Sequence, residues 1–372
     1  YSMLWSETLF LFFIILYFVS IHHYFKTLSS GRLLIVSLVV ALAFATRYAG
    51  ITLLAAGLFL IFFNGELVTR KKIKHLFLFF FTGSSFVTLN LIRNGRAAGH
   101  ITGVREEATR NLRDNLQQIG STLSEWLPFS RGYETVTTIT FVIILLFAIC
   151  LLIYYLLQQQ YFSSYENIVT SFFVVYALFI LTIASISRFE NLTSRLLSPL
   201  YIPMLLIASS WLVGWIQKRF RDKRRILLVF VLLIYAGFQY NHYQLNAEAW
   251  EGIKDAGIPG YTEDSWTQSP AVAMVKKNKS LITQPIYANA NDAVYFLTGI
   301  HATALPHREI QKEVDDFLRL PFFHLIWFID GENTDLVSLN FIKQHKKLVC
   351  MQETAGGAVY FFADSTHILA PK

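Results

Sequence analysis

Charged side chains are scarce in this 372-residue sequence. Asp, Glu, Lys and Arg together make up 15% of it, against about 25% in soluble globular proteins. Hydrophobic residues make up 54% and aromatic residues 16%. This shortage of charge excludes an ordinary soluble domain and predicts a chain that is solvated largely by lipid.

Cysteine and several familiar motifs are also rare or missing. The two cysteines, Cys150 in an apolar run and Cys350 in a strand-like stretch, predict neither a disulfide framework nor a cysteine metal site. We find no phosphate-binding loop, dinucleotide fingerprint, zinc-protease motif or nucleophile elbow. The sequence therefore predicts no metal site and does not support ATP-driven transport by this chain alone.

The positive net charge of +7 has a membrane explanation rather than a nucleic-acid one. Basic residues cluster in two short runs, 70–74 and 218–225, and each run adjoins an apolar stretch. Short loops rich in Lys and Arg are retained in the cytoplasm. We therefore expect these two loops to be cytoplasmic and no nucleic acid to be bound.

Apolar runs of about 20 residues, the length that crosses a membrane, occur at six places. They are 8–25, 75–92, 136–157, 168–186, 197–217 and 225–241. A longer stretch, 33–63, is interrupted by Thr46-Arg47-Tyr48-Ala49-Gly50, which predicts two short helices meeting at a break. Residues 1–241 are therefore expected to form a transmembrane region of about eight helices.

With the basic loops inside, counting crossings places 93–135, 187–196 and everything after 241 outside. The two-helix interpretation of 33–63 also places Glu7 and Arg47 outside, whereas one continuous helix would place Glu7 inside. Within the outer loop 93–135, apolar residues recur every three or four positions, at Val104, Ala108, Leu112, Leu116, Ile119 and Leu123. This spacing predicts a helix lying in the membrane interface, which ends near Trp126 and Pro128.

After Tyr243 the sequence predicts a small α/β domain over 242–372. Strand-like runs occur at 286–288, 325–329, 348–352 and 359–362, and helical segments at 266–278, 291–298, 308–318 and 334–345. Gly356-Gly357 is typical of a hairpin turn. The predicted fold class is mainly α: a multi-pass transmembrane helical bundle with a small C-terminal extracytoplasmic α/β domain.

Polar residues at membrane depth are costly, so they are candidates for function. Glu7 follows Ser6 at the start of the first span, where it either complements the helix dipole or lines an outward-facing cavity. Arg47 and Tyr48 occupy the break in 33–63. An arginine there either reaches the lipid headgroups or binds a phosphate with its planar guanidinium.

Two further arginine-bearing segments leave the membrane on the outer side. Arg93 and Asn94 precede Arg96, Gly99, His100, Gly103 and Arg105, a pattern that suits either an anion or lipid headgroups. Arg195 precedes Ser198 and Pro199 in a short outer loop, where Pro199 and Pro203 are expected to fix the entry into the next helix. Interfacial anchoring is the alternative for Arg195.

These motifs, in this order, resemble the bacterial branch of the GT-C membrane glycosyltransferases. That branch is similar to the protein mannosyltransferases and to the lipid A aminoarabinose transferase. The resemblance covers roughly residues 1–241, and the segment containing Tyr261, Trp266 and Tyr295 resembles the outer domain of that branch. It implies a multi-pass protein of the bacterial inner membrane that moves a sugar from a polyprenyl-phosphate donor lipid to a glycan, lipid or protein acceptor.

The resemblance also implies roles for individual residues. The position matching Arg47 is a basic residue that contacts the lipid phosphate in the aminoarabinose transferase, and Glu7, Tyr48, Arg93, Asn94 and Arg195 are candidate substrate-binding residues. The family's catalytic aspartate follows its first span, and nothing here matches it. Because the chain begins at Tyr1 and enters a span almost at once, we expect that acidic residue to precede Tyr1.

Two other functions remain open from the sequence. A transporter or flippase of lipid-linked sugars would need the same arginines but no catalytic base. A non-catalytic envelope scaffold would bind partners through its outer domain, and scattered rather than converging arginines would favour it. The sequence also leaves open whether a divalent metal takes part.

Overall fold

The computed structural model describes residues 6–98, 108, 110–126, 132–188, 191–219, 224–256, 260–279, 282, 284–329 and 333–364. Contacts divide the chain between Tyr243 and Gln244 into a helical unit and a C-terminal unit. The division lies close to the predicted boundary after residue 241. The secondary structure does not change there, however, because one helix runs through the boundary.

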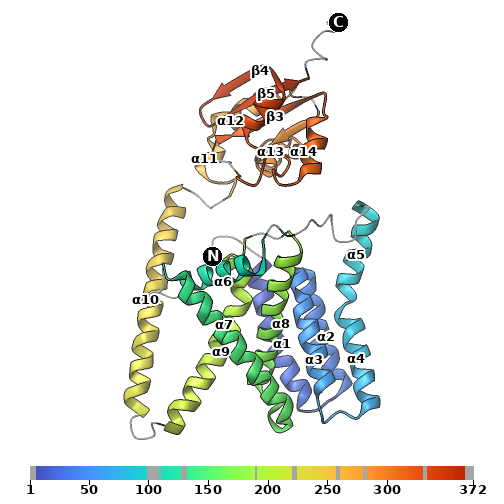
Figure 1. The fold of residues 1–372 in the computed structure, drawn as a ribbon, viewed down its shortest axis with the longest axis vertical. Coiled ribbons are helices and arrows are strands. Elements are labelled where there is room, and N and C mark those ends of the chain that lie inside the picture. Colours follow the sequence, from blue (N-terminus) through green and yellow to red (C-terminus); the bar gives the residue numbers. More distant parts are fainter. Residues whose placement is uncertain are drawn as a thin grey trace. The chain divides into compact units, whose positions relative to one another are not determined.

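The helical unit is built almost entirely of helices that coincide with the predicted apolar runs (Figure 1). Its described elements are α1 (Ser6–Phe25), α2 (Ser30–Thr46), η1 (Tyr48–Gly50), α3 (Ile51–Phe63), α4 (Thr69–Gly83), α5 (Ser85–Ala98), α6 (Leu112–Trp126), α7 (Glu134–Leu157), η2 (Gln159–Tyr161), α8 (Tyr165–Ile186), α9 (Ser194–Arg219) and α10 (Arg224–Ala256).

Three of these helices, α1, α7 and α8, are each long and apolar enough to cross a membrane. Helices α4 and α5 are bent by 45° at their junction and make a fourth candidate if they form one span. Large apolar side chains such as Phe12, Phe77 and Ile143 are exposed on the outer surfaces of α1, α4 and α7, as lipid contact requires. These helices indicate that the chain is associated with a membrane, and the larger number of crossings stays a prediction.

The predicted break in 33–63 is confirmed. Helix α2 ends at Thr46, Arg47 has extended backbone angles (φ −152°, ψ 141°), and η1 leads directly into α3. Gly50 makes this tight turn possible, because a Cβ atom there would lie 2.7 Å from the backbone nitrogen of Phe44. The turn thus brings two hydrophobic helices together and places Arg47 at their shared end.

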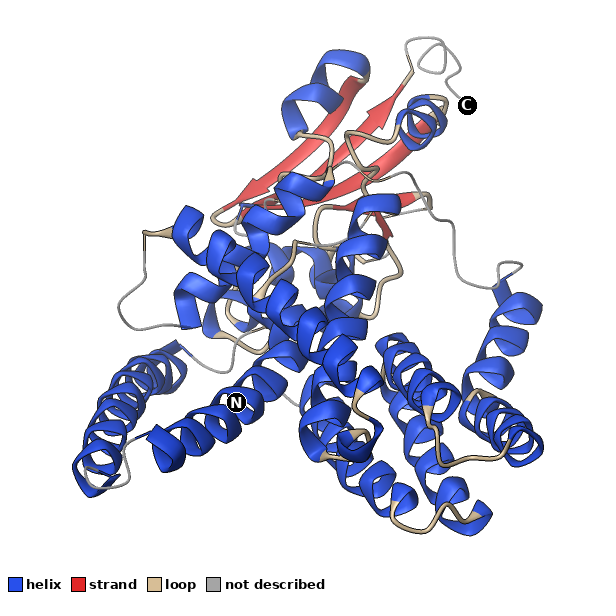
Figure 2. Ribbon diagram, turned by 60° about the horizontal axis from the view of Figure 1, so that its bottom comes forward, coloured by secondary structure: helices blue, strands red, loops and turns tan. Residues whose placement is uncertain are grey.

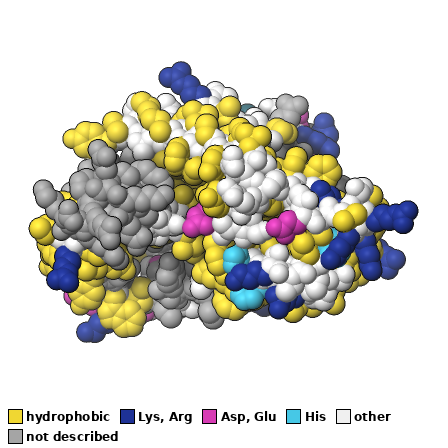
Figure 3. Space-filling model, turned by 90° about the horizontal axis from the view of Figure 1, so that it is seen from below, with side chains coloured by type: hydrophobic (Ala, Val, Ile, Leu, Met, Phe, Trp, Pro, Cys, Tyr) yellow, Lys and Arg dark blue, Asp and Glu magenta, His cyan; other side chains and the backbone are white. Residues whose placement is uncertain are grey.

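The connections predicted to be cytoplasmic lie at one end of the helical unit. The α1–α2, α3–α4 and α7–α8 connections all occur at the lower end in Figure 1. Figure 3 views this end and shows basic side chains gathered beside hydrophobic ones. Exposed basic residues near these connections are Lys26, Arg32, Arg70, Lys71 and Lys74. Glu7 and Arg47 belong to the opposite end of their helices.

Two expectations about the outer segments need correction. Helix α6 lies crosswise at one end of the unit and packs against α7, α8 and α9 (Figure 1). Its apolar stripe is therefore covered by protein, with Ile119 and Leu123 buried, whereas Leu112 is exposed. The helix ends at Trp126 as predicted, and the predicted part at 104–107 lies outside the described residues. Pro199 and Pro203, expected at the entry to α9, lie inside it.

The C-terminal unit contains a five-stranded sheet in the order β2-β1-β3-β5-β4 (Figure 2). Its strands are β1 (Ile286–Ala288), β2 (Thr303–Ala304), β3 (Phe322–Phe328), β4 (Lys347–Thr354) and β5 (Gly357–Ala363). Strands β1, β2 and β3 are parallel, whereas β5 is antiparallel to both β3 and β4. All four predicted strands and the hairpin turn at Gly356 are confirmed, while the short β2 was not predicted.

Helices cover both faces of this sheet. They are α11 (Asp264–Thr267), α12 (Pro270–Lys277), α13 (Asn291–Thr298), α14 (Gln311–Leu318) and α15 (Leu339–His345). Alternate residues of β3 point to opposite faces, so that Ile326 and Phe328 pack with α12 and α13 while Leu325 and Trp327 pack with α14 and α15. The predicted helix 266–278 is two short helices instead, because Ser269-Pro270 starts a new one.

Candidate functional site

A buried carboxylate lies at the centre of the candidate site. Glu7 is in the first turn of α1 and is almost fully shielded from solvent. Its Oε1 atom accepts hydrogen bonds from Nη1 of Arg47 and Nε of Arg195. Three residues from three separate segments, all predicted as site residues, therefore meet at one carboxylate oxygen.

Arg47 owes its position to the helix break. The residue has left the α2 conformation, although its N–H still donates to the Ala43 carbonyl. Its side chain is 17% exposed, so the guanidinium is held within the protein rather than extended toward headgroups. This burial favours a structural or ligand-binding role over the lipid-anchor alternative.

Arg195 enters the cluster from the first turn of α9. Pro199 has no N–H to donate to the Arg195 carbonyl four residues earlier, and the Ser198 hydroxyl donates to that carbonyl instead (3.0 Å). The Arg195 side chain is 43% exposed. Of the two arginines, Arg195 is thus the more exposed.

A tyrosine that no sequence pattern singled out lies beside the cluster. Tyr176, fully buried on α8, donates its hydroxyl proton to the Leu196 carbonyl (2.8 Å). It also interacts electrostatically with Arg47 and Glu7. A lone tyrosine in an apolar span carries no sequence signal that would separate it from other core aromatics.

Tyr48 and Asn94 form a neighbouring polar cluster together with Asn90. The Tyr48 hydroxyl oxygen accepts hydrogen bonds from Nδ2 of Asn90 and Nδ2 of Asn94, each at 3.1 Å. The two asparagines are four residues apart on α5, so they share one helix face. That spacing was the signal by which Asn90 could have been found.

The remaining basic candidates do not join either cluster. Arg93 and Arg96 are exposed on α5, and the structure does not bring Arg93 to Glu7 or Tyr48. The glycine-rich continuation, with His100 and Arg105, lies outside the described residues. That Arg93 is a substrate-binding residue therefore stays a prediction.

Helix α6 holds the segment that leads to Arg195. The side-chain Oε1 of Gln118 accepts from the Leu192 N–H (3.0 Å), and the Thr122 hydroxyl donates to the Leu192 carbonyl (2.7 Å). Nε1 of Trp126 donates to the Ser194 hydroxyl (3.1 Å). Gln118 and Thr122 thus hold the N–H and the carbonyl of Leu192, and Trp126 holds Ser194, the residue next to Arg195.

Metal binding finds little support in this geometry. Among the described residues, no three His, Cys, Asp or Glu side chains are grouped to hold an ion. Glu7 already accepts from two guanidinium groups, so it is poorly placed to be a metal ligand as well. In the structure it holds the guanidinium groups of Arg47 and Arg195.

The cluster as a whole suits an anionic ligand. Two guanidinium groups and one carboxylate leave a net charge of about +1, in surroundings where charges act more strongly than in water. Planar guanidinium groups match phosphate oxygens.

No protein-family model, no curated protein and no solved structure matches this chain.

Proposed function

We propose that this chain is the membrane part of a GT-C-type glycosyltransferase of the bacterial cytoplasmic membrane. It moves a sugar from a polyprenyl-phosphate-linked donor to a glycan, lipid or protein acceptor at the outer face. The observation that supports this best is the meeting of Arg47 and Arg195 at buried Glu7. Such a cluster can receive the donor phosphate where its lipid chain remains in the membrane.

In the proposed reaction, a base takes the proton from an acceptor hydroxyl. The hydroxyl oxygen forms a bond to the anomeric carbon as the bond to the phosphate oxygen breaks, with inversion at that carbon. Charge grows on the departing phosphate, and arginines that are already oriented stabilise it without reorganisation.

The two rival functions differ in their fit to the cluster. A flippase of lipid-linked sugars would use the same arginines, so the cluster alone does not separate it from a transferase. A non-catalytic scaffold would have no need for converging arginines, and the convergence of Arg47 and Arg195 weighs against it. We keep the flippase as the second candidate.

Substitution of Arg47 tests the proposal. Arg47→Lys keeps the charge but loses the planar fork, so we expect sugar transfer to fall by about tenfold or more. Arg47→Ala should lower it further. The measurement is transfer of labelled sugar from a polyprenyl-phosphate donor in membranes, normalised to the amount of protein.

Arg113→Ala, which removes an exposed arginine from α6, is the matched control and should transfer normally. Unchanged transfer in Arg47→Ala would remove Arg47 from the donor site. If the unchanged protein transfers no sugar but moves the donor lipid across the membrane, the flippase is the correct function.

A further inference from the structure

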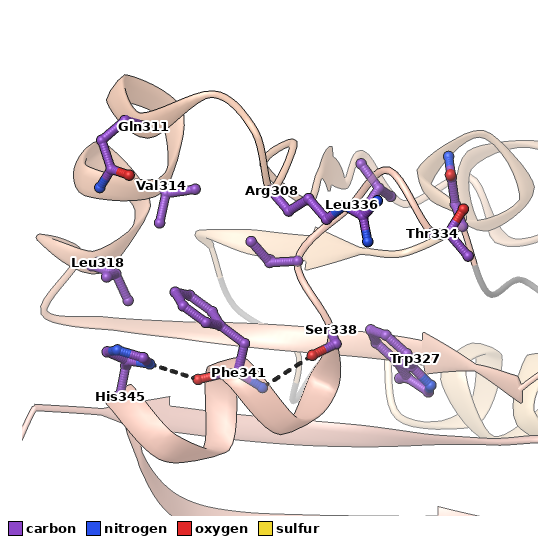
Figure 4. Close-up of a pocket in the computed structure, with 12 residues that line it drawn as sticks. Arg308, Gln311, Val314, Leu318, Trp327, Thr334, Leu336, Ser338, Phe341 and His345 are labelled. Atoms are coloured by element: carbon purple, nitrogen blue, oxygen red, sulfur yellow. Dashed lines mark hydrogen bonds between the residues drawn. The ribbon is translucent and has the colours of Figure 1, made fainter. Parts of the chain in front are cut away.

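A cavity of about 600 Å³ lies in the C-terminal unit between α14, α15 and β3 (Figure 4). Its size is within the range of small-molecule binding sites. Val314, Leu318 and Phe341 point toward one another and form an apolar wall, while Trp327 of β3 also lines it. The proposed transfer reaction uses none of these residues.

The rim of this cavity is preformed. Residues 306–308 pair with 335–337, through Arg308 N–H to the Asp335 carbonyl (2.9 Å) and Val337 N–H to the Pro306 carbonyl (3.0 Å). His307 is tied to α14, since its backbone N–H donates to Oε2 of Glu313 at 2.9 Å. Arg308 is thus carried by a segment that is fixed on both sides, as binding without large reorganisation requires.

A tryptophan N–H at the cavity has no protein acceptor among the described residues. Trp327 is 8% exposed, and among the described residues its indole N–H has no hydrogen-bond partner. The N–H itself is not among the buried unpaired atoms, so it can donate to water or to a ligand in the cavity.

Arg308 and Ser338 supply two further donors at the cavity. Arg308 forms no ion pair with any described carboxylate, and no Asp or Glu is among the described lining residues. The Ser338 oxygen accepts from the Phe341 N–H (3.2 Å), which leaves its proton to donate. His345 Nδ1 donates to the Phe341 carbonyl (2.9 Å), so Nε2 of the neutral ring is an acceptor.

We propose that this cavity binds an acidic sugar, one that carries a carboxylate. The carboxylate pairs with Arg308, ring or hydroxyl oxygens accept from Trp327 and Ser338, and the apolar face of the sugar ring packs against Phe341 and Leu318. This binding site lies in the C-terminal unit and does not depend on the transferase proposal.

Binding of sodium D-glucuronate to the full chain in detergent, measured by ligand-observed NMR titration, tests this proposal. D-Glucose has the same ring without the carboxylate, and acetate has a carboxylate without the ring. We expect glucuronate to bind about tenfold more tightly than glucose, because the charge-assisted bond to Arg308 is lost in glucose. Acetate should bind more weakly than glucuronate by at least as much.

Three variants locate the ligand. Arg308→Gln should reduce glucuronate affinity to about that of glucose, and Trp327→Phe, which removes the N–H but keeps an aromatic ring, should reduce it several-fold. Arg319→Gln is the matched control, since Arg319 is 78% exposed and pairs with Asp316 outside the cavity.

Absence of saturable glucuronate binding, equal binding of acetate and glucuronate, or full affinity in Arg308→Gln would each overturn the proposal. Thermal unfolding of each variant shows whether it is folded. If Trp327→Phe is destabilised, the exposed Arg308 variant decides by itself. Failure here would leave the sugar-transfer assay unaffected, so the two proposals fail independently.

Discussion

At the scale of single residues, the candidate site is a cluster of ion pairs. Each charge offsets the cost of burying its partner of opposite charge. Glu7 is buried with two guanidinium partners, and Arg47 is largely shielded from solvent. A charge in such surroundings is strongly unfavourable when its partner is removed. The same arrangement holds Arg47 in one orientation, which is what a phosphate site needs.

Glu7→Gln should therefore destabilise the protein. Neutralising the carboxylate leaves Arg47 and Arg195 facing each other without a counter-charge, and we expect a loss of roughly 2 kcal/mol or more. Glu66→Gln, at an exposed position in the α3–α4 connection, is the control and should change little. Thermal unfolding in detergent measures both, and equal midpoints would contradict a structural role for the Glu7 cluster.

A second change separates charge compensation from simple packing. If the cost of Glu7→Gln comes from uncompensated arginine charge, the double variant Glu7→Gln/Arg47→Gln should be less destabilised than the sum of its single variants. Additive losses would indicate that the pair does not interact across the cluster. The same unfolding measurement gives the coupling directly.

At the scale of elements, α6 connects the outer surface of the helical unit to the site. It packs so closely on α7 that a Cβ atom at Gly120 would lie 1.8 Å from Oγ1 of Thr138. From this position Gln118, Thr122 and Trp126 hold residues 192–194. Arg195 is therefore positioned by a helix that does not touch Glu7 through any described hydrogen bond.

Thr122→Val tests this positioning. The substitution keeps the side-chain shape but leaves the buried Leu192 carbonyl without its donor, at a cost of about 1–3 kcal/mol. Because the Arg195 segment is then less well held, we also expect lower sugar transfer, with the donor KM raised more than kcat is lowered.

Thr140→Val is the same chemical change at an exposed position of α7, where the hydroxyl bonds only to its own helix (2.8 Å to the Val136 carbonyl). It should leave stability and transfer unchanged. If the two variants behave alike, α6 does not position Arg195.

At the scale of the whole molecule, the two ends of the helical unit differ in character. The end in Figure 3 carries the exposed basic residues of the α1–α2 and α3–α4 connections. Glu7, Arg47 and Arg195 belong to the opposite ends of their helices. Under the positive-inside rule this polarity predicts a cytoplasmic basic end and an outward-facing ion cluster.

Reporter fusions test this orientation. Residues 218–225 are basic and residues 225–241 are the one apolar run between them and the C-terminal unit, so alkaline phosphatase joined after Lys372 should be active outside. The same enzyme inserted in the α7–α8 connection should be inactive. Activity in the second fusion but not in the first would reverse the topology and remove the basis for an outer-face transferase.

Sequence periodicity alone predicted most elements, because each depends on local patterns. The strands of the C-terminal unit were predicted from short strand-like runs, and α13 was predicted at 291–298, as observed. Strand β2 has only two residues, too few to form such a run. The placement of helix starts within 308–318 and 334–345 was early by several residues, since Arg308 and Asp335 form the paired rim segments instead.

The sequence by itself determined that the chain is a membrane protein with a C-terminal α/β unit, and that Glu7, Arg47 and Arg195 stand where apolar helices begin or break. These features are properties of neighbouring residues. Only the tertiary structure decided that the three charges meet, that Arg93 stays apart, that α6 is covered by other helices, and that Trp327 lines a cavity. Each of these depends on contacts between segments far apart in the chain, for which no local pattern is a substitute.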